Sequence, residues 1–252
     1  MEIRHSVYGG HIAIVTIANE IRRNAMTRAM MADLAQLWDR LDADPACRAV
    51  ILTGAGKKAF CAGADISGDL SASPEMAQTV NRALLKDTVF TKPIVAAVNG
   101  DCAGGGVELL ISTDIRGADP SARFGLPEVR YAIYPFGGAA VKLVHQIGYV
   151  HAMDLLLTGR LVDAAFAARI GLVNLVTEPG RVMEWATGVA QTIAANSPAA
   201  VQAVKQQIST GIAENVRSRE ALEQELGDRV RASADFAEGV AAFREKRKAE
   251  YP

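Results

Sequence analysis

Short apolar segments, each followed by a loop and then by a helical pattern, recur in the first half of this sequence, and two of the three loops contain glycines. Residues 11–18 alternate as a strand does, and residues 48–53 and 93–98 are short apolar or β-branched runs. Residues 27–41 repeat apolar side chains at helical spacing, and residues 74–90 form a second candidate helix. This alternation predicts an α/β fold with functional residues in the loops that leave the strand ends.

The second half of the sequence has a different character. After residue 135 the pattern is almost entirely helical, and four amphipathic segments follow Pro198. We therefore expect an α/β core in residues 1–196 and a helical region in residues 197–252. The helical region is too small to bury its own apolar faces, so it should dock on the core or on another subunit.

Composition excludes several classes of function. Half of the 252 residues are apolar and the formal net charge is −1, which gives no general attraction to nucleic acid or to an anionic membrane. No apolar run reaches the ~18 residues that span a bilayer, and the first residues are unlike a signal peptide. Three widely spaced cysteines contain no CxxC pair, so neither a disulfide framework nor a metal site is indicated. We expect a soluble, cytoplasmic protein.

The most informative motif, in residues 99–110, reads NGDCAGGGVELL and follows an apolar strand. Its three glycines lie where a helix should begin, and the first amides of a helix lack partners within the helix. Such amides suit a developing negative charge, and glycine lets a ligand approach the backbone closely. Glu108 lies three residues past Gly105, so its side chain can share a face with that amide. Taken alone, such a run is more often only a tight turn with an acid in the first turn of the helix.

Two further segments carry comparable signals. Residues 58–67 read KAFCAGADIS and offer bare amides after a strand, although an ordinary loop with Asp65 as a helix cap has the same appearance. Residues 124–129 read FGLPEV and place Glu128 directly after a proline, where a surface acid in a turn is the plainer interpretation. Each segment by itself leaves the function open.

Together, the AF-x-AGAD-I, GGG-x-E-L and FG-x-PE segments resemble the crotonase, or enoyl-CoA hydratase/isomerase, family. Residues 23–26 (RNAM), 155–160 (LLLTGR) and 235–251 are also similar to that family, so the resemblance covers essentially the whole chain. It implies a core of repeated ββα units with a helical C-terminal trimerisation region. It further implies a homotrimer or a dimer of trimers that acts on an acyl-CoA thioester and needs no separate cofactor.

The resemblance also implies roles for individual residues. The Ala64 and Gly105 amides would form an oxyanion hole, and Glu108 and Glu128 would be the catalytic acid and base. Further positions would bind coenzyme A, namely Ala62, Asp65, Ile66 and, reaching a neighbouring subunit, Phe243 and Lys246. Tyr134 and Phe136 stand where many hydratases have smaller residues, so they would line the acyl pocket.

The implied reaction is reversible addition of water to a 2-enoyl-CoA. In that family Glu108 would activate the water and Glu128 would deliver a proton to Cα. The nearest alternatives are a double-bond isomerase, which usually needs only the acid at position 128, and a hydroxyacyl-CoA dehydratase. An oligomer that binds acyl-CoA without turnover, and a hydrolase with a serine or cysteine nucleophile, are alternatives of other classes. No GxSxG motif supports a hydrolase.

Overall fold

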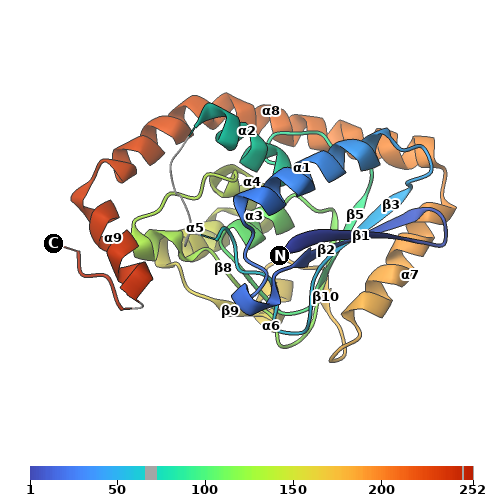
Figure 1. The fold of residues 1–252 in the computed structure, drawn as a ribbon. Coiled ribbons are helices and arrows are strands. Elements are labelled where there is room, and N and C mark those ends of the chain that lie inside the picture. Colours follow the sequence, from blue (N-terminus) through green and yellow to red (C-terminus); the bar gives the residue numbers. More distant parts are fainter. Residues whose placement is uncertain (66–72, 246, 252) are drawn as a thin grey trace.

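Two β-sheets form the centre of the protein (Figure 1), and the computed structural model describes residues 1–65, 73–245 and 247–251. Within them the larger sheet has the order β1-β2-β3-β5-β7-β10, with β1 antiparallel to β2 and every other pair parallel. Its strands are β1 (Glu2–Tyr8), β2 (Ile12–Ala18), β3 (Ala49–Gly54), β5 (Ile94–Val98), β7 (Ile115–Ala118) and β10 (Leu175–Val176). The three strands predicted from the sequence are confirmed as β2, β3 and β5.

The smaller sheet lies beside the larger one and has the order β4-β6-β8-β9 within the described residues. Its strands are β4 (Ala59–Cys61), β6 (Asp101–Ala103), β8 (Arg123–Gly125) and β9 (Val162–Asp163). The chain passes three times from the larger sheet to the smaller one, from β3 to β4, from β5 to β6 and from β7 to β8. A helix follows each passage, so the expected repeated ββα units are confirmed.

Alternation along the central strands divides the core into two layers. Val50 and Leu52 of β3 point into the main apolar cluster with helix α1 (Arg28–Ala43), whereas Ala49 and Ile51 pack with helix α7 (Val182–Ala195) on the opposite face. Successive strand residues point to opposite faces, so a wholly apolar strand fits a sheet that is covered on both sides. Helix α1 begins where predicted, because the Thr27 side chain accepts a hydrogen bond from the Met30 amide.

The second predicted helix is shorter than residues 74–90. Helix α2 (Pro74–Ala83) ends early, and Leu85 adopts a left-handed φ of 50°. Trp38 Nε1 donates a hydrogen bond to the Ala83 carbonyl at 3.0 Å, and Leu84 and Phe90 are buried in the main cluster. Packing of these apolar side chains therefore overrides the local helical pattern.

The C-terminal region is helical, as predicted, but its four expected segments form only two helices in the described residues. Helix α8 (Pro198–Arg231) runs the length of the molecule and helix α9 (Ala234–Glu245) turns back at one end (Figure 1). No proline interrupts α8 after its first turn, which explains its continuity. Both helices dock on the core of their own chain. Residue 196 does separate α7 from α8, while the division into two domains there stays a prediction.

The remaining elements are short and connect these layers. They are the 3₁₀ turns η1 (Glu20–Arg22) and η2 (Pro127–Tyr131) and the helices α3 (Gly105–Leu110), α4 (Ala139–Ile147), α5 (Tyr149–Thr158) and α6 (Ala164–Arg169). The small strands β9 and β10 were not expected in the region after residue 135. No helix among the described residues is both long and apolar enough to cross a bilayer.

Two glycines of helix α8 give a matched test of this packing. A methyl group at Gly227 would collide with the Phe136 ring, whereas a methyl group at Gly211 would meet nothing within 4 Å. Gly211→Ala should raise the free energy of unfolding by ~0.5–1 kcal/mol, because alanine favours the helix. Gly227→Ala should instead lower it by ~1–3 kcal/mol through overpacking. Urea unfolding at one protein concentration measures both, and equal stabilisation by the two variants would contradict this packing.

Candidate active site

The three glycines at the start of helix α3 differ in what the structure requires at each position. Gly104 has a φ of 55°, a conformation that other residues rarely adopt. Gly106 packs so closely on the Cys61 carbonyl that no side chain fits. A side chain on Gly105 would meet no heavy atom closer than 3.5 Å. A Cβ at Gly105 would therefore make only ordinary contacts, with the backbone of Gly63 and the Ala64 nitrogen.

The Gly105 amide lies beside a second free amide, that of Ala64. Met26 bonds to the segment after β4 through the Gly63 carbonyl and the Asp65 amide, at 2.8 and 2.9 Å. The Ala64 N–H between these bonds consequently points to the other side. It lies 3.5 Å from the position that a Cβ on Gly105 would take. Neither amide donates a hydrogen bond within the described residues.

Glu108 carries a buried carboxyl group in the first turn of α3, three residues after Gly105. The residue is 5% exposed, and its Oε1 accepts a 2.6 Å hydrogen bond from the Gly137 amide. Gly137 has no room for a side chain, since a Cβ there would lie 2.5 Å from Glu108 Cδ. Burial raises the pKa of Glu108 to about 7, and the hydrogen bond from Gly137 opposes that rise.

Glu128 approaches the same point from the 3₁₀ turn η2. Strand β8 pairs with β6, and the Gly104 amide donates to the Gly125 carbonyl at 2.9 Å, which places Glu128 next to Gly104. Glu128 Oε1 lies 3.0 Å from the Cβ position of Gly104, and its buried Oε2 has no hydrogen-bond partner in the described residues. Burial, and then the nearby charge of Glu108, raise the pKa of Glu128 to about 8.

Comparison with known proteins shows the family of this chain. The model of the family described as "Enoyl-CoA hydratase/isomerase" matches residues 8–252. The chain belongs to this family.

Individual relatives are similar to this chain over nearly its whole length. The chain is 43% identical to "Enoyl-CoA hydratase EchA19" of Mycobacterium tuberculosis, over 94% of this chain and 92% of that protein. It is 37% identical to "Short-chain-enoyl-CoA hydratase" of Clostridium acetobutylicum, over 96% and 94%. A solved structure of a carnitinyl-CoA dehydratase from Mycobacterium avium 104 is similar at a TM-score of 0.87, with 34% identity over 99% of this chain and 98% of that one.

The residues expected to bind coenzyme A are distributed more widely. Ala62 and Asp65 lie next to the Ala64 amide, and Asp65 pairs with Arg22 at 3.3 Å. Ile66 and Lys246 lie outside the described residues. Phe243 of α9 packs edge-on against Tyr131 of its own chain, with ring centroids 5.1 Å apart. Its predicted contact with a neighbouring subunit stays a prediction.

Tyr134 and Phe136, the residues expected to line the acyl pocket, form an aromatic pair with ring centroids 5.2 Å apart. Both are partly buried in the loop between η2 and α4, which also contains Gly137. Helix α8 holds Phe136 from behind, because Gly227 contacts the ring and Arg231 lies 4.2 Å from its centroid. The two aromatic residues therefore belong to the same loop that binds the Glu108 carboxyl group.

Sequence reasoning missed several residues of the site. It gave no role to Gly137, or to the buried residues Lys86, Lys142 and Glu223 that lie around Glu108. Only Gly137 belonged to a visible signal, the glycine pair that follows Phe136. Lys86 lies within a predicted helix and Glu223 in a strongly charged helical segment, where both would normally be solvated.

The buried carboxyl groups predict an unusual dependence of stability on pH. Their folded-state pKa values, about 7 for Glu108 and about 8 for Glu128, exceed the 4.5 of an exposed glutamate. Their favourable contribution as neutral acids is therefore complete below pH 4.5 and is lost as the pH rises through the folded values. The wild-type protein should lose a few kcal/mol of unfolding free energy between about pH 5 and about pH 9.

Glu108→Gln and Glu128→Gln should each reduce this loss, because glutamine stays neutral. The exposed Glu184 provides a matched control, and Glu184→Gln should behave like the wild type. Urea unfolding of all four proteins at both pH values is the measurement. An unchanged pH dependence in the Glu108 and Glu128 variants would show that these carboxyl groups are not buried as neutral acids.

Proposed function

We propose that this chain catalyses the reversible addition of water to a 2-enoyl-CoA. One observation carries the proposal: two free amides, of Ala64 and Gly105, and two buried carboxyl groups, of Glu108 and Glu128, gather around the Gly104–Gly105 backbone. The chain's family and its named hydratase relatives support this reaction.

The amides would bind the thioester oxygen. When water adds to Cβ, electrons move through the double bond to the carbonyl and leave negative charge on that oxygen. Donors that are fixed before the reaction stabilise this charge without having to reorganise, and loss of one typically costs ~3–4 kcal/mol. Ala64 and Gly105 offer two such donors from backbone that is held by Met26 and by helix α3.

The carboxyl groups would transfer the protons. Glu108 would take a proton from water as the oxygen bonds to Cβ, and Glu128 would give a proton to Cα as the enolate collapses. Burial raises the pKa of both carboxyl groups above 4.5, so the pair can hold a proton at neutral pH. The two carboxyl groups titrate as a coupled pair. At the start of hydration, and equally of dehydration, the pair must hold one proton in total.

Dehydration of a hydroxyacyl-CoA is the reverse of this reaction and uses the same groups. A double-bond isomerase would need only one acid, which would leave the burial of Glu108 unexplained. A protein that only binds acyl-CoA would gain nothing from Glu128, whose buried Oε2 has no hydrogen-bond partner among the described residues and costs stability. Burial raises the pKa of Cys61 to about 12 and that of Cys102 well above its usual value, which disfavours a cysteine nucleophile.

We also propose a homo-oligomer, as a trimer or a dimer of trimers. Large apolar side chains are exposed on helices α5 and α8, namely Tyr149, Val150, Leu157, Val204 and Ile208. Such groups usually mark contact surfaces. The three free cysteines fit the reducing cytoplasm. The reaction leaves oxidation states balanced, so it needs no cofactor besides the coenzyme A of the substrate.

Substitution of the carboxyl groups tests the reaction. Glu108→Gln and Glu128→Gln should each lower kcat for crotonyl-CoA hydration by ~10²–10⁴-fold, because general acid–base catalysis contributes about that much. Glu184→Gln is the control and should keep full activity. Loss of the enoyl-thioester absorbance measures the rate. Undiminished hydration by a folded Glu108 or Glu128 variant would overturn the assignment.

Gly105→Ala tests the amides separately. A methyl group there fits without a contact under 3.5 Å, so folding should be preserved, but it would lie beside the Ala64 amide and obstruct it. We expect kcat/KM for crotonyl-CoA to fall at least ~10²-fold, the effect of losing one oxyanion donor. Gly211→Ala, at an exposed position of helix α8, is the matched control. Full activity of Gly105→Ala would mean that the thioester oxygen binds elsewhere.

A further inference from the structure

A buried ion pair lies behind the candidate active site. Lys86, which follows helix α2, and Glu223 of helix α8 bring Nζ and Oε1 to 2.8 Å, and their side chains are only 5% and 4% exposed. The contact is an ion pair without hydrogen-bond geometry, since Glu223 Oε1 has no hydrogen-bond partner in the described residues. Burying two charges carries a large desolvation cost, so such a pair adds little to stability by itself.

The pair packs against the loop that binds Glu108. Gly138 follows the Gly137 amide that donates to the Glu108 carboxyl group. The Cβ position of Gly138 lies 3.3 Å from Lys86 Cγ and 3.8 Å from Val216 Cγ1 of α8. The stem of Lys86 and helix α8 therefore enclose this loop.

Both charges of the pair act on Glu108. Glu223 raises the pKa of Glu108, and Lys86 lowers it by a smaller amount. For Glu128, the charge that acts is that of Glu108, which raises its pKa. The ion pair thus acts on only one of the two carboxyl groups that hydration must keep in different protonation states.

Two other titratable groups face Glu108. Lys142 of helix α4 donates from Nζ to the Leu85 carbonyl and to Ser112 Oγ, both at 2.8 Å, and burial lowers its pKa to about 7. The partly buried Tyr134 faces both Glu223 and Glu108, and burial raises its pKa. Tyr134 is neutral at physiological pH, and the two hydrogen bonds of Lys142 go to a backbone carbonyl and a serine and not to Glu108. The ion-pair charges that shift the pKa of Glu108 are those of Glu223 and Lys86.

We propose that Lys86 and Glu223 are positioning residues that set the proton affinity of Glu108, and that docking of helix α8 thereby completes the acid–base pair. The inference rests on the proposed hydration. Glu223 holds a proton on Glu108 near neutral pH, and Lys86 limits this effect so that Glu108 can still act as a base. Because Glu223 belongs to α8, a site without that helix would lose this balance.

The pH profile of kcat/KM for crotonyl-CoA hydration tests the proposal, because its acid limb reports deprotonation of the base in the free enzyme. Lys86→Met removes a positive charge and should move the acid limb to higher pH. Glu223→Gln removes a negative charge and should move it to lower pH. Each shift should be about one pH unit, the order of magnitude expected when one nearby charge is removed from a buried site. Lys86→Arg keeps the charge and should restore the wild-type limb.

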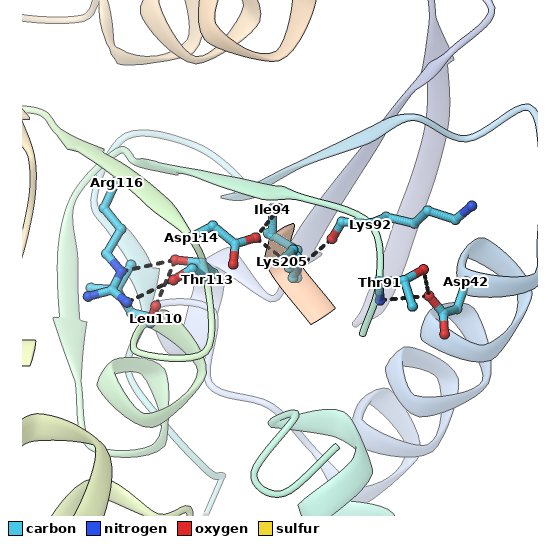
Figure 2. A network of polar contacts seen from close by, with 9 residues as sticks. All are labelled: Asp42, Thr91, Lys92, Ile94, Leu110, Thr113, Asp114, Arg116 and Lys205. Carbon is cyan, nitrogen blue, oxygen red and sulfur yellow. Dashed lines mark hydrogen bonds and ion pairs between the residues drawn. The ribbon is translucent and has the colours of Figure 1, made fainter. Parts of the chain in front are cut away.

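Lys205 provides the matched control. It also lies on α8, and its Nζ bonds to the Lys92 carbonyl at 2.6 Å and pairs with Asp114 at 2.8 Å (Figure 2). The charged groups that act on it are Asp114 and Asp42, and not Glu108. Lys205→Met should therefore leave both limbs of the profile in place. If Lys205→Met shifted the acid limb as far as Lys86→Met does, the shift would come from a general loss of packing, and the proposal would be overturned.

The double variant Lys86→Met/Glu223→Gln leaves no unpaired charge, so it should fold even if a single variant does not. Its acid limb should lie between those of the single variants and below that of the wild type, since Glu223 has the stronger effect. Unmoved limbs, or single variants that shift in the same direction, would overturn the inference. If the wild type hydrates no enoyl-CoA, the proposed function fails instead. The ¹³C chemical shift of the Glu108 carboxyl group, assigned with Glu108→Gln, then reports the same pKa changes without turnover.

Discussion

The close approach of two stretches of backbone is the constraint on which the site depends. Strands β4 and β6 run parallel, with Cys61 paired to Cys102, so the loops that follow them leave the same edge of the smaller sheet. Gly106 must lack a side chain because it packs on the Cys61 carbonyl, and Gly104 must adopt a positive φ to start helix α3 there. These two requirements bring the Ala64 and Gly105 amides together.

Burial of two carboxyl groups beside these amides then determines the electrostatics. A carboxylate that leaves water loses hydration, so both groups hold their protons more tightly than an exposed glutamate does. Glu108 recovers part of that loss from the Gly137 amide, whereas no group in the described part of the chain donates to Glu128 Oε2. The same surroundings that separate an acid from a base also make the folded protein less stable at alkaline pH. Stability and the proposed catalysis are thus opposed at this site.

Much of the fold and some of the site could be predicted from local patterns. Alternation identified β2, apolar runs identified β3 and β5, and apolar side chains at helical spacing over residues 27–41 identified α1. The glycine run and the two glutamates were visible because each lies in a short, dense motif. Features that depend on packing between segments far apart in the sequence could not be predicted. The early end of α2 depends on Trp38, and the two-residue strand β9 depends on pairing with β8. The contact between Lys86 and Glu223 joins residues 137 positions apart in the chain, and neither segment has a local signal for it.

The two free N–H groups belong to the main chain and not to side chains. A codon change at position 64 or 105 alters what surrounds an amide, but only a change to proline removes its hydrogen. The glutamates have no such protection, since a single nucleotide change converts either into a residue with different chemistry. A duplicated gene in which either glutamate is replaced would therefore still encode both N–H groups, so a new side-chain chemistry can arise at the site without loss of the main-chain donors.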